Sequence, residues 1–174
     1  MNITSLKESF LIHCSDLKLK KNHEQIAIVE LLIKFYKNSE KENNFFSRLF
    51  SPKESKLGFY LYGDVGVGKT MVLNFFYDSL TIPKQRLHFN EFMISVHDFI
   101  HQNKEKSKTE NLLELFVKNL KQKTELIYFD EFQVTNIVDA MILGKLFQTI
   151  FNHNIKAIFT SNTQIDNLYQ DGLQ

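Results

Sequence analysis

The feature that most constrains the fold is the run Gly63-Asp64-Val65-Gly66-Val67-Gly68-Lys69-Thr70, which matches the GxxxxGK[ST] pattern of a phosphate-binding P-loop. The run follows an apolar, β-prone stretch at residues 57–62 and opens a helical pattern at residues 69–80. In this strand–loop–helix context the backbone N–H groups of the loop face phosphate oxygens, the Lys69 ammonium contacts the β and γ phosphates, and the Thr70 hydroxyl binds Mg²⁺. The loop therefore predicts a nucleotide triphosphate and Mg²⁺ as ligands.

Strand and helix patterns alternate after the loop. Strands are expected at residues 87–89, 126–129 and 157–160, and helices at 91–101, 112–120 and 137–151. This alternation predicts βαβ units, and so an α/β fold of three layers with a parallel sheet under helices on both faces. Before the loop, a helix at residues 23–37 leads into a polar stretch. We therefore expect a helical lead-in and linker at 1–56 and a P-loop core at 57–174.

Two adjacent acids, Asp130 and Glu131, follow the continuously apolar strand 126–129. Ligands of open α/β sheets bind at the carboxyl ends of the strands, so this pair is expected at the same edge as the P-loop. An acid at this position holds Mg²⁺, which fits Asp130, and a second acid can deprotonate the attacking water, which makes Glu131 the candidate general base. The alternative is a pair of solvated acids at a strand end.

Three other polar groups are weaker candidates. Asn162 ends the strand 157–160 and could place its amide near the γ-phosphate and the attacking water, although an ordinary polar turn is the alternative. His97 and His101 lie four residues apart on one helix, but no third ligand at a suitable spacing favours zinc over a half-exposed helix face. His88 could line the site, without a partner that the sequence identifies.

Composition limits the remaining possibilities. The formal net charge of the 174 residues is +1, so the chain has no overall field that would attract nucleic acid or a membrane. Cys14 is the single cysteine, which fits a reducing compartment and predicts a cytoplasmic protein. No apolar run approaches the roughly 20 residues that span a bilayer.

Several further stretches resemble the ZapE-type AAA+ ATPases of bacteria and their mitochondrial AFG-one-like relatives. From about Gly58 to the end of the chain, the sequence runs GFYLYG, GKTM, FY, RLHF, EFM, VH, FDEFQVT, DAMILG, TSN and DNLYQDGLQ in that order. The FDEFQVT and DAMILG runs, which begin at Phe129 and Asp139, are specific to this family in a way that the P-loop is not.

The resemblance implies an ATPase whose hydrolysis of ATP drives work on protein partners, in bacterial cell division through the division-ring protein or in membrane-protein quality control. It implies a homo-oligomer, in the cytoplasm or peripheral at the inner membrane, in which Lys69 and Thr70 serve the P-loop, Asp130 and Glu131 the Walker B pair, and Asn162 the sensor. It also implies the strand order 5-1-4-3-2.

The chain departs from the family pattern in two ways. Asp64 and Val67 stand where the family commonly has a small and a basic residue. The family pattern also continues past Gln174 into an arginine, a fifth strand and a helical lid, so we expect an incomplete core. Neither Arg48 nor Arg86 lies where an arginine finger is expected. The alternative function is a nucleotide-binding adaptor, or a catalytically crippled fragment, that binds ATP without turnover.

Overall fold

The computed structural model describes residues 5–41, 56–105 and 109–168. The helices are α1 (Leu6–Asp16), α2 (His23–Lys41), α4 (Lys69–Ser79), α5 (Phe89–Asn103), α6 (Thr109–Lys121) and α7 (Ile137–Asn152). The strands are β1 (Gly58–Tyr62), β2 (Lys84–His88), β3 (Leu126–Asp130) and β4 (Lys156–Ser161), followed by a short 3-10 helix, η2 (Ile165–Asn167). Strands and helices alternate from β1 onward, as the sequence predicts.

The chain divides into two compact units. One comprises the described parts of residues 1–59 and 65–81, and it holds α1, α2 and α4. The other comprises the described parts of residues 60–64 and 82–174, and it holds β2, β3, β4 and the helices α5 to α7. The P-loop helix α4 therefore belongs to the same unit as the N-terminal helices.

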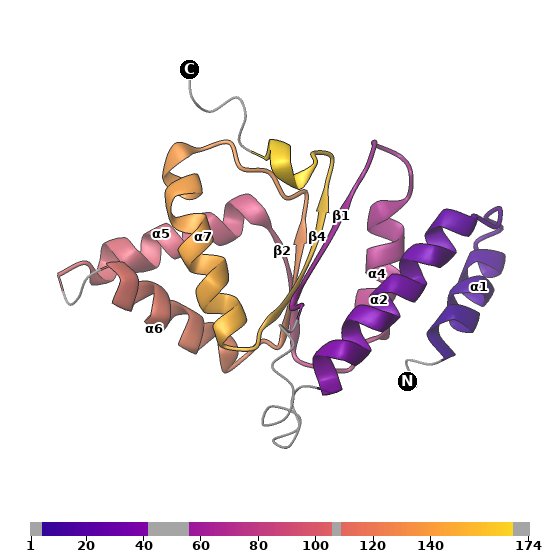
Figure 1. Ribbon diagram of the computed structural model, residues 1–174, viewed down its shortest axis with the longest axis horizontal. Helices are drawn as coiled ribbons and strands as arrows, with labels where there is room; N and C mark the ends of the chain where they lie inside the picture. Colours follow the sequence, from indigo (N-terminus) through magenta and orange to yellow (C-terminus); the bar gives the residue numbers. More distant parts are fainter. Residues whose placement is uncertain (1–4, 42–55, 106–108, 169–174) are drawn as a thin grey trace. The chain divides into compact units, whose positions relative to one another are not determined.

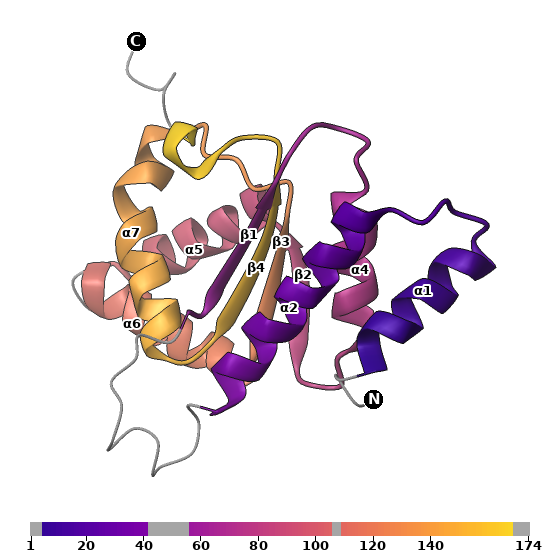
Figure 2. The same ribbon diagram turned by 45° about the vertical axis from the view of Figure 1, so that its right-hand side comes forward.

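In the first unit the three helices pack against one another through apolar and aromatic side chains (Figure 2). The buried residues of α1, Leu6, Phe10 and Cys14, are four apart and so share one face of the helix. The Phe10 ring lies edge-on to Phe75 of α4, with ring centroids 5.1 Å apart. Tyr36 of α2 contacts Phe76 of α4 in a similar way at 6.3 Å. These contacts position the first turn of α4, where the P-loop ends.

The second unit also contains residues 60–62 of β1, and its sheet has the strand order β1-β4-β3-β2, in which β3 runs parallel to both β2 and β4. Figure 1 shows α5, α6 and α7 on the same side of this sheet. Every residue of β3 and β4 is buried, which explains the apolar runs 126–129 and 157–159 within them. Phe129 lies at the centre of the core, where its ring contacts those of Phe89, Phe92, Phe147 and Phe159.

The fold class predicted from the sequence, α/β with a parallel sheet, is confirmed, and the strand order agrees with the 1-4-3-2 part of the expected order. Two elements differ from prediction. The helix α1 was not predicted, because the apolar run Phe10-Leu11-Ile12 is too short to show a helical period by itself. The strand β2 begins at Lys84, where a turn was expected, because Pro83 lacks only its own N–H and its carbonyl accepts a hydrogen bond from Glu125 N at 2.8 Å.

Two other expectations concern the polar linker and membrane-spanning segments. The helix predicted at residues 23–37 continues to Lys41, so the polar stretch expected from Asn38 begins as helix. Residues 42–55, with Arg48, lie outside the described residues, so the domain boundary at residue 56 stays a prediction. Among the helices that the structure describes, none combines the length and the apolar character needed to cross a bilayer.

Candidate functional site

The P-loop begins where β1 ends and runs into α4. Gly66 and Gly68 have φ angles of 84° and 86°, in the left-handed region that disfavours side chains. Both positions therefore favour glycine, although the GxxxxGK[ST] pattern itself requires it only at Gly68 of the two. Of the residues predicted to bind nucleotide here, Val65 is 82% exposed and Val67 49% exposed, and Asp64 is also exposed.

The N-terminus of α4 has the features of an anion-binding helix end. Gly68 is its N-cap, no side chain caps the helix there, and the first turn carries no acid. The first backbone N–H groups of a helix have no partner within the helix and attract negative charge. Lys69 is half-buried as the first helical residue and Thr70 is exposed beside it, while buried Val72 and Leu73 anchor the next turn. This helix end fits a phosphate group.

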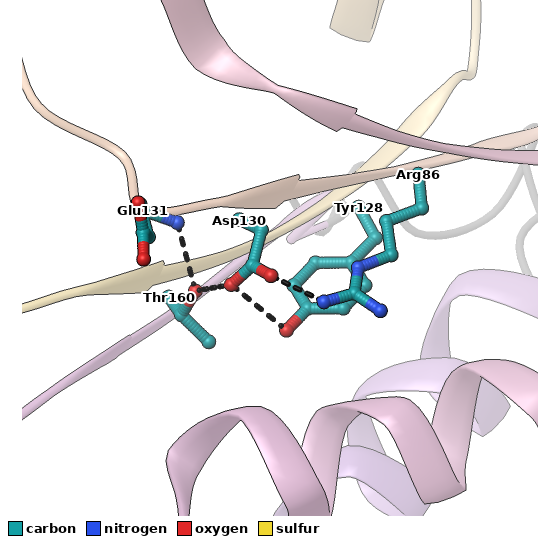
Figure 3. Close-up of polar contacts among 5 residues, drawn as sticks. All are labelled: Arg86, Tyr128, Asp130, Glu131 and Thr160. Atoms are coloured by element: carbon teal, nitrogen blue, oxygen red, sulfur yellow. Dashed lines mark hydrogen bonds and ion pairs between the residues drawn. The ribbon is translucent and has the colours of Figure 1, made fainter. Parts of the chain in front are cut away.

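In the second unit, the carboxylate of Asp130 is the centre of a buried polar cluster at the end of β3 (Figure 3). Its Oδ1 accepts hydrogen bonds from the Thr160 hydroxyl at 2.7 Å and the Tyr128 hydroxyl at 3.3 Å. Its Oδ2 forms an ion pair with the Arg86 guanidinium from the edge strand β2. Asp130 is only 6% exposed, so these partners replace most of the water that would otherwise solvate its charge.

The cluster shifts two pKa values in opposite directions. Burial alone would raise the pKa of the Asp130 carboxyl, but hydrogen bonds from Thr160 and Arg86, together with the charge of Arg86, outweigh it and lower the pKa. Burial, and then the negative charge of Asp130, raise the pKa of the Tyr128 phenol to about 12. At neutral pH the cluster therefore holds a carboxylate anion beside an un-ionised phenol.

Glu131, the next residue, has a different environment. Its backbone has a φ of 55°, an uncommon conformation for a residue with a side chain, and its side chain is exposed. The Glu131 N–H donates to the Thr160 hydroxyl oxygen at 3.1 Å, and the Phe132 N–H donates to the Thr160 carbonyl at 2.7 Å. Two hydrogen bonds to one residue of β4 thus hold the chain in this strained turn and direct Glu131 to solvent.

Asn162 directly follows β4 and is exposed. The turn around it is fixed, because the Thr163 N–H donates to the Ser161 hydroxyl at 3.0 Å and the Tyr60 hydroxyl donates to the Thr163 carbonyl at 2.7 Å. Since β3 and β4 are parallel neighbours, the residues after them, Glu131 and Asn162, leave the sheet at the same edge.

The structure also places the histidines. His88 stands opposite Asp130 in the β2–β3 register and is exposed. His97 of α5 pairs with Asp139 of α7, with Nε2 and Oδ1 2.6 Å apart. Within the described ranges, no three His, Cys, Asp or Glu side chains are grouped as a metal-ion cage would need.

The residues present nevertheless fit Mg²⁺. This ion prefers oxygen ligands and is usually held by one or two carboxylates together with phosphates and water, rather than by a cage made only of protein. Asp130 supplies an anionic carboxylate that accepts hydrogen bonds from Arg86, Tyr128 and Thr160, and a carboxylate has about four acceptor positions. Direct or water-mediated contact with one cation is compatible with this arrangement.

Three members of the cluster were not assigned to the site from the sequence: Arg86, Tyr128 and Thr160. Thr160 begins the TSN run and Tyr128 directly precedes the FDEFQVT run, while Arg86 begins the RLHF run, just before the strand expected at residues 87–89. Arg86 and Thr160 carry little signal in the sequence because they reach Asp130 across strands, from 44 and 30 residues away. Tyr128 lies two residues from Asp130 in β3, but its sequence alone does not show that its hydroxyl faces the carboxylate.

The fold and these residues define an α/β protein with a P-loop sequence and a buried acid at the end of a central strand. The chain belongs to the AFG1-like ATPase family, whose model matches residues 14–174. It is 42% identical over 118 residues to the "Cell division protein ZapE" of Escherichia coli K12, covering 67% of this chain and 31% of that protein. It is 40% identical over 126 residues to the "Lactation elevated protein 1 homolog B" of Danio rerio, covering 67% of this chain and 25% of that protein.

The matched region therefore spans about a quarter to a third of the length of these curated relatives. Among solved structures, the chain is similar to DnaI with a TM-score of 0.48 and 19% identity, over 87% of this chain and 73% of that one.

The backbone strain at Glu131 leads to the first prediction. Replacing Glu131 with Asn, which tolerates φ near 55° better, should raise the free energy of unfolding by about 0.5–1 kcal/mol. Lys18→Asn is the matched control, because Lys18 also has a φ of 55° and lies far along the chain from the acids. Urea denaturation measures the free energy of unfolding of both variants and of the parent. A Glu131→Asn variant less stable than the parent would contradict the strain argument.

The second prediction concerns Arg86 and pH. The pKa of Asp130 is lower in the folded chain than in the unfolded chain. As pH falls below the ordinary value of 3.8, the unfolded chain therefore takes up a proton at this carboxyl before the folded chain does, and the contribution of Asp130 to stability is lost. Arg86→Met should destabilise the protein by about 1–3 kcal/mol at pH 7, since a buried carboxylate loses a charged partner. The difference from the parent should shrink as pH falls below about 4.

Chemical denaturation between pH 3 and pH 7 measures this difference, with Lys123→Met as a control at an exposed lysine. A stability loss that is the same at both ends of the range would show that Arg86 acts only through packing.

Proposed function

We propose that this chain binds ATP with Mg²⁺ and hydrolyses it, as the core of an AAA+ ATPase. The loop from Gly63 to Thr70 wraps the triphosphate, and the Lys69 ammonium contacts the β and γ phosphates. Thr70 and Asp130 would hold Mg²⁺, which would neutralise charge on the phosphate oxygens. Glu131 deprotonates the attacking water, and Asn162 contacts the γ-phosphate or that water.

The observation that carries the proposal is the contrast between two consecutive acids in a chain of an ATPase family. Asp130 is buried and its pKa is lowered, so it stays an anion and keeps a fixed orientation, as a metal ligand must. Glu131 is exposed and held outward by a strained turn, as a base that reaches water must be. Two acids that were merely solvated would share one environment, so the contrast supports different roles.

The surrounding residues support each role. Thr160 orients the Asp130 carboxylate through its hydroxyl, and Arg86 balances the carboxylate charge. The same Thr160 oxygen accepts from the Glu131 N–H, so one side chain positions both acids. The Glu131 carboxylate then accepts the proton of the water as its oxygen attacks the γ-phosphorus, and the leaving group is ADP.

The third prediction separates binding from chemistry. Lys69→Ala should lower the affinity for ATP by about tenfold or more, because a direct charge on the phosphates is lost. Glu131→Gln should retain binding and lower turnover by about 10²- to 10⁴-fold, because an amide cannot accept the proton. Fluorescent-nucleotide titration and phosphate release measure the two quantities.

The exposed residues Lys123 and Glu105 provide the matched controls, as Lys123→Ala and Glu105→Gln. Parent-like turnover by Glu131→Gln would refute the assignment of Glu131. Tight ATP binding by a parent chain without turnover would instead identify the nucleotide-binding adaptor.

The proposal extends to a protein partner. The relative in Escherichia coli is named a cell division protein, and the family resemblance of this chain points to hydrolysis coupled to work on proteins. The chain thus acts in the cytoplasm, as part of a homo-oligomer, on a component of the division machinery. Membrane-protein quality control is the competing process.

The fourth prediction tests this partner with the division-ring tubulin homologue. Polymers of that protein should co-sediment the Glu131→Gln variant with ATP more than the Lys69→Ala variant, by about threefold or more, if binding depends on the ATP state. Equal sedimentation of both variants, or none of either, would exclude an ATP-dependent contact with the division ring.

A further inference from the structure

The side chain of Gln25, 42 residues before Val67 in the sequence, contacts the P-loop within the first unit. Its Nε2 donates a hydrogen bond to the backbone carbonyl of Val67 at 3.2 Å. A Cβ atom added at Gly68 would lie 2.5 Å from the same Nε2, so the amide rests directly against the Gly68 backbone. Gln25 therefore touches the loop at its last two residues before Lys69.

The position of Gln25 is fixed by the start of α2. The Asn22 side chain caps this helix, since its Oδ1 accepts from the backbone N–H groups of Glu24 at 2.9 Å and Gln25 at 3.4 Å. One turn further, Ile26 and Val29 are buried. In an Asn-x-x-Gln cap the glutamine side chain usually returns to the backbone of the cap residue. In this chain the Gln25 side chain instead donates to the backbone of the P-loop.

This hydrogen bond determines which way one peptide group of the loop faces. No peptide bond among the described residues is cis, so the carbonyl of Val67 and the N–H of Gly68 point in opposite directions across their shared peptide. Because the carbonyl points to Gln25, the Gly68 N–H points away from α2. The loop needs its N–H groups, rather than its carbonyls, to face the phosphates. A peptide flip at this position would present a carbonyl oxygen to the anion.

We propose that Gln25 is a positioning residue of the nucleotide site, which holds the Val67–Gly68 peptide in the orientation that binds phosphate. This inference rests on the proposed function and adds a residue outside the P-loop to it. Gln25 acts through the loop backbone, so its effect concerns the phosphates and does not depend on the base. Pre-organisation of this kind increases affinity because the ligand no longer has to order the loop.

The experiment compares the affinity of the parent chain and its variants for Mg²⁺–ATP and for Mg²⁺–tripolyphosphate, which has no base or sugar. Gln25→Ala should weaken both ligands by the same factor, about 3- to 10-fold, as expected for one neutral hydrogen bond. Gln25→Glu keeps the shape but turns the donor into a carboxylate facing a carbonyl oxygen. It should weaken both by more than about tenfold.

Gln102→Ala, at an exposed glutamine of α5, is the matched control and should bind both ligands as the parent does. All affinities are measured below the thermal unfolding transition of each variant, so that folded proteins are compared. A loss for ATP with unchanged affinity for tripolyphosphate would make Gln25 a contact of the base and overturn the inference. Unchanged affinity for both would also overturn it. If the parent itself binds neither ligand, the proposed function fails instead.

Discussion

The acidic half of the candidate site depends on two hydrogen bonds of the Thr160 hydroxyl group. It donates to the Asp130 carboxylate at 2.7 Å and accepts from the Glu131 N–H at 3.1 Å. One oxygen atom of β4 thus orients the carboxylate of one acid and the backbone of the next. Without it, Asp130 would lose a partner while buried, and the unfavourable φ of Glu131 would lose one of the contacts that compensate for it. The aromatic core beneath, centred on Phe129, holds β3 and β4 in the register that makes this contact possible.

Much of the fold could be predicted because the strands that build it are buried. The apolar runs 126–129 in β3 and 157–159 in β4 identify central parallel strands, and their position between helical patterns gives the α/β class. The strand β2 was harder to delimit, because it lies at the edge of the sheet and its sequence is mostly polar, with Leu87 as its one apolar residue. The helix α1 has a narrow buried face made of Leu6, Phe10 and Cys14. Their four-residue spacing is hard to recognise in the sequence, because the third member is a cysteine beside polar residues.

For the candidate site, the sequence predicted the residues whose position follows from local rules. Glycines with positive φ belong to the P-loop pattern, and an acid pair after a buried strand belongs at the carboxyl edge of the sheet. The partners of these residues could not be predicted in the same way. Arg86 and Thr160 reach Asp130 only after β2 and β4 pair with β3, and Gln25 reaches the loop only after α2 packs in its unit. Such contacts depend on tertiary structure, which no short window of sequence contains.

The environment of Tyr128 makes the acid cluster observable by optical spectroscopy without a label. The chain contains no tryptophan, so its near-ultraviolet absorption and emission come mainly from its six tyrosines. The Tyr128 ring lies under the Arg86 guanidinium, 5.1 Å from the centroid, and its hydroxyl donates to the Asp130 carboxylate. A phenol between a cation and an anion changes its electronic transitions when either charge is neutralised. An unmodified chain therefore carries its own chromophore for changes in charge at this carboxylate.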